Sequence, residues 1–402
     1  MTSTPRVSVL IPSYNHARFL PAAIESALGQ TFPDVEVLVA DDGSSDGSLE
    51  VAERYAAAHP SRVRVVSHPD RRNHGIGATF NLALRHARGA YFRPFASDDV
   101  LCRDSIELQA RYLDERPELG LVHGLAQRID AGGNVLDAVI GEDLGRGANV
   151  LERLVEANGI AGLTVLLRRE CLERVGEQDE SLVYSDWEFW IRMAAHFEIG
   201  FLPRVLAWYR VHGSSTTASA SREDDLDRAL AVMARLAEVG PRAGGSIAAP
   251  RVQALVQLQT AYLCFSCAER EMALRALGLA FVADPSLRGD AAYLAGWLSR
   301  RPDLEFRVWL IEQLQAFGAG LERRLLHDPA GKTILEDLIA NAHRLCEAHS
   351  YGEARRLLAA TLRVHPASVA DRRVLSSMTK LIVGRRGTAA IKLLKRALHP
   401  IH

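Results

Sequence analysis

The sequence predicts an α/β fold, a mostly parallel sheet flanked by helices, followed by an all-α domain. Short apolar runs alternate with amphipathic stretches over residues 7–100, which is typical of a parallel sheet with helices on both faces. Beyond about residue 222 the strand patterns give way to helical ones rich in Ala, Leu, Arg and Glu. A polar, Ser- and Thr-rich stretch at 212–219 separates the two parts. We therefore expect domains at 1–220 and 221–402.

The composition is that of an ordinary globular chain. Of the 402 residues, 48% are hydrophobic and 24% charged, and the formal net charge is -1, which gives no reason to expect a nucleic-acid partner. Five cysteines are scattered along the chain, as in proteins of a reducing compartment. No secretory leader pattern and no stretch of about 18 apolar residues is present. We expect a cytoplasmic protein.

The expected elements follow from the period of the apolar residues. Strands are expected where apolar runs are short and bounded by turn residues, and helices where apolar residues recur every three or four positions. The expected strands are at 6–11, 35–40, 62–67, 90–95, 163–167 and 201–209, with further apolar runs at 120–122 and near 129. The expected helices are at 16–30, 48–59, 78–88, 104–115, 150–157 and 185–196. The Gly-rich segment 141–149 is expected to be a loop.

In the helical part, two stretches share a layout. Residues 261–285 and 342–366 place Ala, Arg, Leu and a closing Pro at equivalent positions, which resembles a tetratricopeptide-like helix-turn-helix. A generic α-helical bundle is the alternative. The tail 371–402 carries eight Lys or Arg against one Asp, so its last helix is expected either to contact the inner face of a membrane peripherally or to pack as a solvated terminal helix.

Polar residues follow the first two expected strands directly. Pro12, Tyr14 and Asn15 follow the first strand, and Asp41 and Asp42 end the second. In open α/β sheets, ligands bind outside the carboxyl ends of the strands, so these residues indicate a binding site. Asp-Asp-Gly-Ser is also good turn chemistry, which leaves a structural role open for the two acids.

Ser97, Asp98 and Asp99 follow the fourth expected strand. Two adjacent carboxylates repel each other, and a positive group beside them offsets this repulsion. A divalent cation bound to a diphosphate is such a group. A solvated acidic turn or a helix cap is the alternative.

Two later residues extend the site. Asp186 lies at the first turn of an expected helix, next to aromatic residues, where it is either a helix cap or a rigidly held general base. His212 leaves the last expected strand just ahead of the Ser- and Thr-rich stretch, either as a structural residue or as a ligand.

Taken together in this order, the segments of residues 6 to about 215 resemble a family 2 glycosyltransferase with the GT-A fold. The matching segments are 7–15, 30–32, 41–44, Asn73 with Gly75, 96–99, 168–169, and 185–187 followed by Arg192. The chain departs from the family where Ser185, not Glu, precedes Asp186, and where the acidic triplet reads Ser-Asp-Asp.

The resemblance implies roles for individual residues. Tyr14 would stack on the nucleotide base, Asp42 would accept a base N–H, and Asp186 would deprotonate the acceptor hydroxyl. The remaining nucleotide-sugar contacts would come from Pro12, Asn15, Asp41, His74 and Asp98. The metal ligands for Mn²⁺ or Mg²⁺ would be Asp99 and His212, and the acceptor contacts would be Trp187 and Glu188.

The function that this resemblance implies is metal-dependent, inverting transfer of a sugar from a nucleotide-diphosphate donor, a UDP-sugar, to a hydroxyl of a glycan, lipid-linked or protein acceptor. Bacterial surface polysaccharide or glycan synthesis is the expected setting. The alternative is a catalytically idle nucleotide-sugar-binding domain whose helical part is a scaffold. A nucleotidyltransferase is disfavoured because residues 12–15 lack a Gly-rich loop with a basic residue.

Overall fold

The structure is a computed structural model, and it describes residues 6–145, 147–213, 221–243, 245–317, 321–348, 350–365, 368 and 370–383. The chain divides into two compact units, Met1–Leu263 and Cys264–His402. The change from strands to helices falls near residue 220, where the sequence predicted a domain boundary. The compact units divide later because the first long helix after the sheet packs against helix α7 of the first unit.

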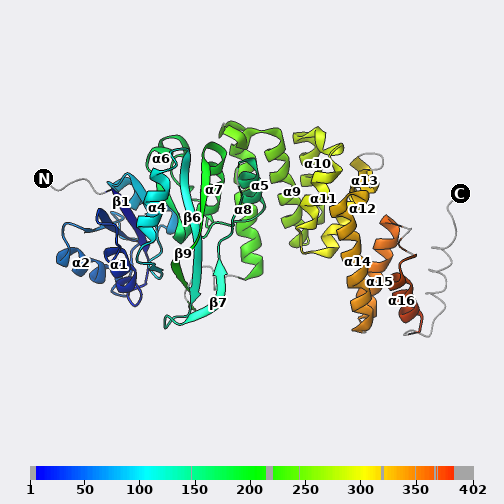
Figure 1. Ribbon diagram of the computed structural model, residues 1–402, viewed down its shortest axis with the longest axis horizontal. Helices are drawn as coiled ribbons and strands as arrows, with labels where there is room; N and C mark the ends of the chain where they lie inside the picture. Colours follow the sequence, from blue (N-terminus) through cyan, green and yellow to red (C-terminus); the bar gives the residue numbers. More distant parts are fainter. Residues whose placement is uncertain are drawn as a thin grey trace. The chain divides into compact units, whose positions relative to one another are not determined.

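The first unit contains a nine-stranded mixed sheet (Figure 1). Its strand order is β3-β2-β1-β4-β8-β6-β9-β5, with β7 paired to β6. The strands are β1 (Val7–Ser13), β2 (Val35–Asp41), β3 (Val63–Ser67), β4 (Tyr91–Pro94), β5 (Val100–Leu101), β6 (Leu119–Ile129), β7 (Val135–Ile140), β8 (Leu166–Arg168) and β9 (Glu198–Arg210). Strands β1 to β4 are parallel, as the alternating pattern predicts, whereas β5, β7 and β8 pair antiparallel with their neighbours.

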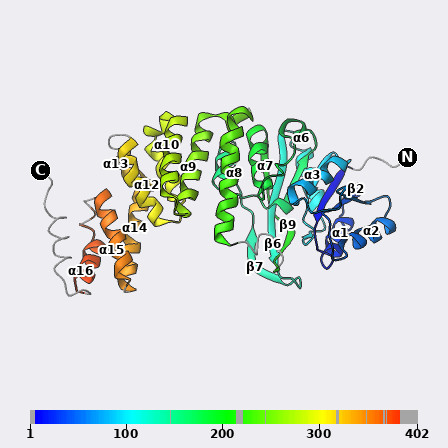
Figure 2. The same ribbon diagram turned by 180° about the vertical axis from the view of Figure 1, so that it is seen from behind.

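Helices cover both faces of the parallel part of the sheet. Strand β2 is buried along its whole length, and its Val- and Leu-rich sequence suits a strand that is covered on both sides. The apolar stripe of α1 packs with α2 and α4 in one core, and α3 packs on β1 and β2 (labelled from behind in Figure 2). The helices of this unit are α1 (Leu20–Leu28), α2 (Ser48–Ala58), α3 (Ile76–His86), α4 (Ser105–Asp114), α5 (Ala148–Glu156), α6 (Glu170–Val175), α7 (Ser185–His196), α8 (Arg222–Ala243) and most of α9 (Pro250–Ser266).

Two sequence predictions differ from the structure in more than their end residues. The apolar runs at 120–122 and near 129 form one long strand, β6, which pairs in parallel with β9 along its length. The expected strand at 163–167 is a 3₁₀ turn at Gly162–Thr164 followed by the short β8. The helix expected at 185–196 is observed with those bounds as α7.

The pairing of β5 with β9 organises the site. Strand β5 comes directly after the acid pair and runs antiparallel to β9, with Val100 opposite Trp208. This register places Asp98 and Asp99 beside the end of β9, from which His212 follows. A contact across more than 100 residues of sequence is thereby fixed by backbone pairing.

The second unit is helical. Its helices after α9 are α10 (Arg270–Ala283), α11 (Ala291–Ser299), α12 (Leu304–Phe317), α13 (Leu321–His327), α14 (Pro329–Glu347), α15 (Tyr351–Val364) and α16 (Arg372–Val383). Helices α14 and α15 pack against each other. The positions that match in the two similar stretches have matching burial: Ala261 and Ala342, Ala273 and Ala354, and Leu277 and Leu358 are all buried.

The tetratricopeptide-like repeat itself remains a prediction.

Among the described helices, none has the length and hydropathy needed to cross a bilayer. The basic end of the tail, 384–402, and the Ser- and Thr-rich stretch at 214–220 lie outside the described residues.

Candidate active site

The loops after β1 and β2 are tied together by hydrogen bonds. Asn15 has a positive φ of 54°, and its Oδ1 accepts the Ser45 N–H at 2.9 Å, while its own N–H donates to Ser44 Oγ at 3.1 Å. Tyr14, the preceding residue, is 46% exposed. The aromatic ring next to this rigid loop is therefore accessible to a planar ligand.

Asp42 holds the loop in front of α3. Its Oδ1 accepts the His74 N–H at 2.7 Å, and its Oδ2 accepts Asn73 Nδ2 and the Gly75 N–H, each at 3.0 Å. A carboxylate offers about four acceptor positions, so three internal bonds leave room for about one more. Asp42 thus has a structural role that the sequence did not reveal. It is as buried as Asp41, and His68 Nε2 lies 3.6 Å from its Oδ1, so the nucleotide contact expected of it stays a prediction.

Asp41 and Gly43 shape the turn itself. Asp41 Oδ1 accepts the N–H groups of Gly43 and Ser44, both at 3.1 Å, and the Asp41 side chain is buried. Gly43 has φ +75°, and a Cβ there would lie 2.7 Å from the Arg71 carbonyl oxygen. Asp41 was expected to contact the nucleotide, but its carboxylate is not exposed. Pro12, which lies opposite Ala40 in the sheet and was expected to make a similar contact, is only partly buried.

His74 lies on the surface of the same loop. Its Nε2 pairs with Asp70 Oδ1 at 2.9 Å, and its ring stacks on His68 with centroids 4.2 Å apart. The ring is substantially exposed, so the expected contact with a diphosphate stays a prediction.

The acid pair after β4 is anchored from β9. The Arg210 N–H donates to Asp99 Oδ1 at 2.8 Å, and Arg210 Nε donates to the Asp98 carbonyl oxygen at 2.8 Å. Burial, and then the charge of Asp98, hold the pKa of Asp99 well above its usual range. The Asp99 carboxylate is thus bonded to the backbone of β9, and its expected role as a metal ligand stays a prediction.

The side chains of His16, Asp98 and His212, which come from three different loops, lie close together. Asp98 Oδ2 accepts His212 Nε2 at 3.0 Å, and one ligand atom each of His16, Asp98 and His212 lies within 4.8 Å of the other two. The His16 Nδ1 is hydrogen-bonded to Ser97 Oγ at 2.7 Å. Burial lowers the pKa of His16, so its imidazole is neutral near pH 7, the form that binds metals.

This cluster passes a chemical test for a divalent cation. Two imidazoles and one carboxylate are ligands that first-row transition metals accept in proteins. Asp99, which the sequence assigned to the metal, is not a member of the cluster, and His16, which it did not assign, is. His212 takes part as expected.

Asp186 lies in the first turn of α7, partly exposed. Its Oδ1 accepts the Trp187 N–H at 2.7 Å, and its Oδ2 is 3.4 Å from the position that a Cβ on Gly162 would occupy. Burial raises the pKa of Asp186, against these hydrogen bonds. A carboxylate of raised pKa that still reaches solvent is suited to accept a proton from a bound hydroxyl.

Trp187 and Glu188 point into the protein. The Trp187 indole N–H donates to the Leu154 carbonyl oxygen at 2.6 Å, and Glu188 Oε1 pairs with Arg192 Nε at 2.7 Å. Both side chains are buried, so the acceptor contacts expected of them have no exposed surface in this structure. Their observed role is to fix α7 to α5 and to its own next turn.

The donor side and the base side of the site meet at α3. The N–H of Gly75, which caps α3, binds Asp42, and two residues later a Cβ on Gly77 would lie 3.1 Å from Ser185 Oγ. The first turn of α3 therefore lies between the loop that Asp42 holds and the residue that precedes Asp186.

Comparison with known proteins agrees with this fold. Residues 8–189 match the family model described as glycosyl transferase family 2, a little under half of the chain. Residues 8–189 are thus similar to a family 2 glycosyltransferase domain, and the sheet with its flanking helices has the GT-A fold. Arg210 and His212 lie beyond the matched range.

Individual relatives and a solved structure are also similar to this chain. The chain is 39% identical over 132 residues to a chondroitin synthase of Escherichia coli, covering 33% of this chain and only 19% of that protein. It is 29% identical over 221 residues to an uncharacterized glycosyltransferase of Rickettsia prowazekii, covering 54% of this chain and 67% of the relative. Residues 1–349 of S. aureus TarS, solved in complex with UDP-GlcNAc, share the fold with a TM-score of 0.58 at 18% identity, covering 83% of this chain and 92% of that one.

Replacing Gly43 with alanine is expected to loosen the two loops that Asp42 joins. The positive φ and the 2.7 Å approach to Arg71 both oppose a Cβ, at a cost of about 2 kcal/mol. Hydrogen exchange in peptides covering 41–48 and 68–75 should accelerate roughly 30-fold. Gly213→Ala, where nothing lies within 4 Å, is the matched control; equal exchange in both variants would contradict this account of Gly43.

Replacing Asp186 with asparagine is expected to stabilise the fold. Because the pKa of Asp186 is raised in the folded protein, ionisation of this residue lowers the free energy of unfolding. This loss of stability is absent well below pH 3.8 and reaches its full size above the pKa of the folded state. The thermal midpoint of the variant should therefore exceed that of the wild type at pH 8, by roughly 2–4 °C per kcal/mol, and the difference should shrink as pH falls.

Glu188→Gln is the control for this experiment. It removes one charge of the buried pair with Arg192 and should lower the midpoint at pH 8. A lower midpoint for Asp186→Asn as well would show that Asp186 is a stabilising carboxylate.

Proposed function

We propose that the first unit is an inverting glycosyltransferase that transfers a sugar from a nucleotide-diphosphate donor, a UDP-sugar, to a hydroxyl acceptor. The observation that carries this proposal is the arrangement around α3. Asp42 holds the residues in front of α3 on the donor side, and Ser185, the residue before the carboxylate of raised pKa, Asp186, lies against Gly77 of the same helix. The family 2 match over this range supports the same function.

In the proposed reaction, Asp186 accepts the proton of the acceptor hydroxyl. The acceptor oxygen then forms a bond to the anomeric carbon while the bond from that carbon to the diphosphate oxygen breaks, and the nucleoside diphosphate leaves with the electron pair. A single in-line displacement inverts the configuration. The raised pKa of Asp186 favours this step because a stronger base takes the proton more completely.

The cluster of His16, Asp98 and His212 is the proposed site for the divalent cation, which when bound would offset the charge of the diphosphate leaving group. Mg²⁺ prefers oxygen ligands, whereas Mn²⁺ also accepts imidazole nitrogen. Of the two ions, the cluster therefore favours Mn²⁺. In this assignment Asp99 supports Asp98 from behind through its bond to the Arg210 N–H.

The acceptor class and the setting are inferred from the relatives. A chondroitin synthase builds a glycan, and the match to it supports a glycan acceptor and a role in bacterial surface polysaccharide synthesis. The match covers 132 residues, 33% of this chain, and does not account for the helical unit, which is proposed to serve acceptor binding or recruitment.

Asp186→Asn should abolish turnover and spare donor binding. Loss of a general base typically costs about 10²- to 10⁴-fold in rate. Hydrolysis of UDP-GlcNAc and of GDP-mannose in the presence of Mn²⁺ measures turnover, and calorimetry with the same donors measures affinity, which should stay within about twofold. Glu180→Gln, a nearby exposed acid, is the control and should keep full turnover.

Persistent turnover in Asp186→Asn would contradict the assignment of the base. A wild-type protein that binds donors tightly but turns over none of them would instead favour the idle nucleotide-sugar-binding alternative.

Metal binding is expected to depend on both histidines of the cluster. Mn²⁺ that binds only the native state raises stability by about 2.7 kcal/mol at a hundredfold excess over its dissociation constant. His16→Ala and His212→Ala should each remove more than half of the Mn²⁺-induced rise in thermal midpoint. Asp99→Asn should keep most of it, and so should the control His86→Ala, an exposed histidine at the end of α3.

The opposite pattern would reverse the assignment. If Asp99→Asn removes the shift and His16→Ala does not, Asp99 is the ligand and His16 is a neighbour of the site.

A further inference from the structure

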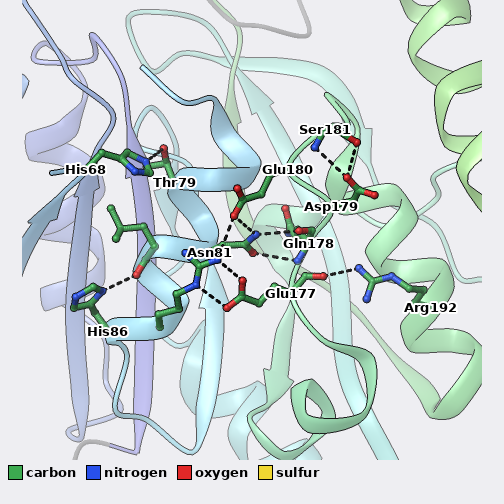
Figure 3. Close-up of polar contacts among 12 residues, drawn as sticks. His68, Thr79, Asn81, His86, Glu177, Gln178, Asp179, Glu180, Ser181 and Arg192 are labelled. Carbon is green, nitrogen blue, oxygen red and sulfur yellow. Dashed lines mark hydrogen bonds and ion pairs between the residues drawn. The ribbon is translucent and has the colours of Figure 1, made fainter. Parts of the chain in front are cut away.

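The loop that precedes α7, residues 176–184, here called the base loop, is bound on its inner side by a single buried residue of α3. Asn81 Nδ2 donates to the Gln178 carbonyl oxygen at 2.9 Å, and Asn81 Oδ1 accepts the Gln178 N–H at 3.1 Å (Figure 3). Asn81 Nδ2 also reaches Glu180 Oε1 at 2.9 Å. Asn81 is 1% exposed, so these bonds are shielded from water. The asparagine thus binds the base loop in the way one strand binds another, by both groups of one peptide.

Gln178 carries this contact to the start of α7. Its side-chain Oε1 accepts the Ser185 hydroxyl at 2.9 Å, and both residues are buried. Ser185 is the residue before Asp186, and it packs against α3, where a Cβ on Gly77 would lie 3.1 Å from its Oγ. A buried path of hydrogen bonds therefore runs from Asn81 through Gln178 to the residue next to the carboxylate.

The outer side of the base loop is held by exposed ion pairs. Arg85 of α3 binds Glu177 through two bonds, Nε to Oε1 at 2.8 Å and a guanidinium nitrogen to Oε2 at 2.5 Å. Arg192 of α7 donates to the Glu177 carbonyl oxygen at 2.7 Å. Exposed pairs such as Arg85 with Glu177 contribute little to stability. Of the contacts between the loop and α3, the buried ones of Asn81 therefore hold it more firmly than the exposed pair of Arg85 with Glu177. Helix α8 holds the loop as well, through Arg235 and Asp179.

We propose that Asn81 and Gln178 are positioning residues for Asp186, which they hold through Ser185 at a fixed place relative to the donor loop on the same helix. This inference rests on the proposed role of Asp186 as the base. Since α3 binds Asp42 at its first turn and the base loop further along, one rigid element sets the separation of donor and base. A displacement of about 1 Å between reacting groups can cost about 100-fold in rate.

Gln178 allows a sharp test because only one of its side-chain atoms is used in the path. Gln178→Met removes the acceptor for Ser185 at nearly constant volume, whereas Gln178→Glu keeps an acceptor oxygen at the same position. Arg85→Gln loosens the outer side of the same loop and is the matched control.

We expect Gln178→Met to lower kcat for UDP-GlcNAc hydrolysis with Mn²⁺ about 10- to 100-fold while the KM for the donor stays within about twofold. Gln178→Glu and Arg85→Gln should remain within about threefold of the wild type. The acid limb of the kcat profile should move to lower pH in Gln178→Met, because a loosened base loop admits water to Asp186. A residue that only stabilises the fold would change the thermal midpoint and leave this limb in place.

A second readout does not need turnover. If the base loop keeps Asp186 shielded, the stabilisation gained by Asp186→Asn at pH 8 should fall to half or less in the Gln178→Met background and stay unchanged in the Arg85→Gln background. An unchanged gain in Gln178→Met overturns the proposal.

The two hypotheses fail separately. Turnover that survives Asp186→Asn contradicts the base assignment. Turnover that is lost in Asp186→Asn but unchanged in Gln178→Met contradicts only the positioning role.

Discussion

The carboxylate of Asp42 and its three hydrogen bonds to residues 73–75 are the contact on which the site depends. They fix the start of α3 to the carboxyl end of β2, and they do so with a side chain that is itself buried. Charge-assisted bonds to backbone N–H groups are among the stronger ones in proteins, and they lose strength steeply with distance. The position of α3 is therefore set at the edge of the sheet where we propose that a nucleotide binds. The base loop, which is bonded to α3, is positioned relative to the same edge.

The second fixed point is the acid pair, and its physics is different. Asp98 and Asp99 are adjacent carboxylates that repel each other, and Asp99 Oδ1 accepts the backbone N–H of Arg210. Arg210 uses its side chain on the Asp98 backbone instead. Asp98 is left facing His16 and His212, so the site concentrates ligand atoms in one place and keeps the second carboxylate out of the way. The burial of Asp99 therefore accompanies the arrangement in which Asp98 faces the two histidines.

Much of this could be predicted from the sequence, because the parallel strands and the residues at their ends are local features. The Val-rich runs of β1 and β2, the acids after β2 and β4, and the bounds of α7 are all visible as patterns of neighbours. What could not be predicted are contacts set by distant register. The β5–β9 pairing brings Asp98 and Asp99 to Arg210 and His212, and His16 joins them from the loop after β1 through its bond to Ser97. Nothing near His16 in the sequence marks it as a candidate ligand.

The predicted acceptor role of Trp187 and Glu188 finds no support in their burial, for a related reason. Both residues follow Asp186 directly in the sequence, and this proximity suggested a shared function. A helix turns by about 100° per residue, so neighbours of a residue that faces a ligand face elsewhere. Trp187 and Glu188 are consequently used to hold α7, which a rigid base also requires.

The extent of the catalytic unit follows from the same reasoning. The base loop is bound from outside by α8, where Arg235 Nε lies 2.6 Å from Asp179 Oδ2 and the Tyr184 hydroxyl donates to Asp225 Oδ1 at 2.5 Å. Helix α8 begins beyond residue 220, where the strands end, and it is nonetheless a wall of the segment that carries Asp186. A division of the chain by type of secondary structure would separate the base loop from one of its supports. The division by compactness, after Leu263, keeps them together, and it is the one that matches how the proposed base is held.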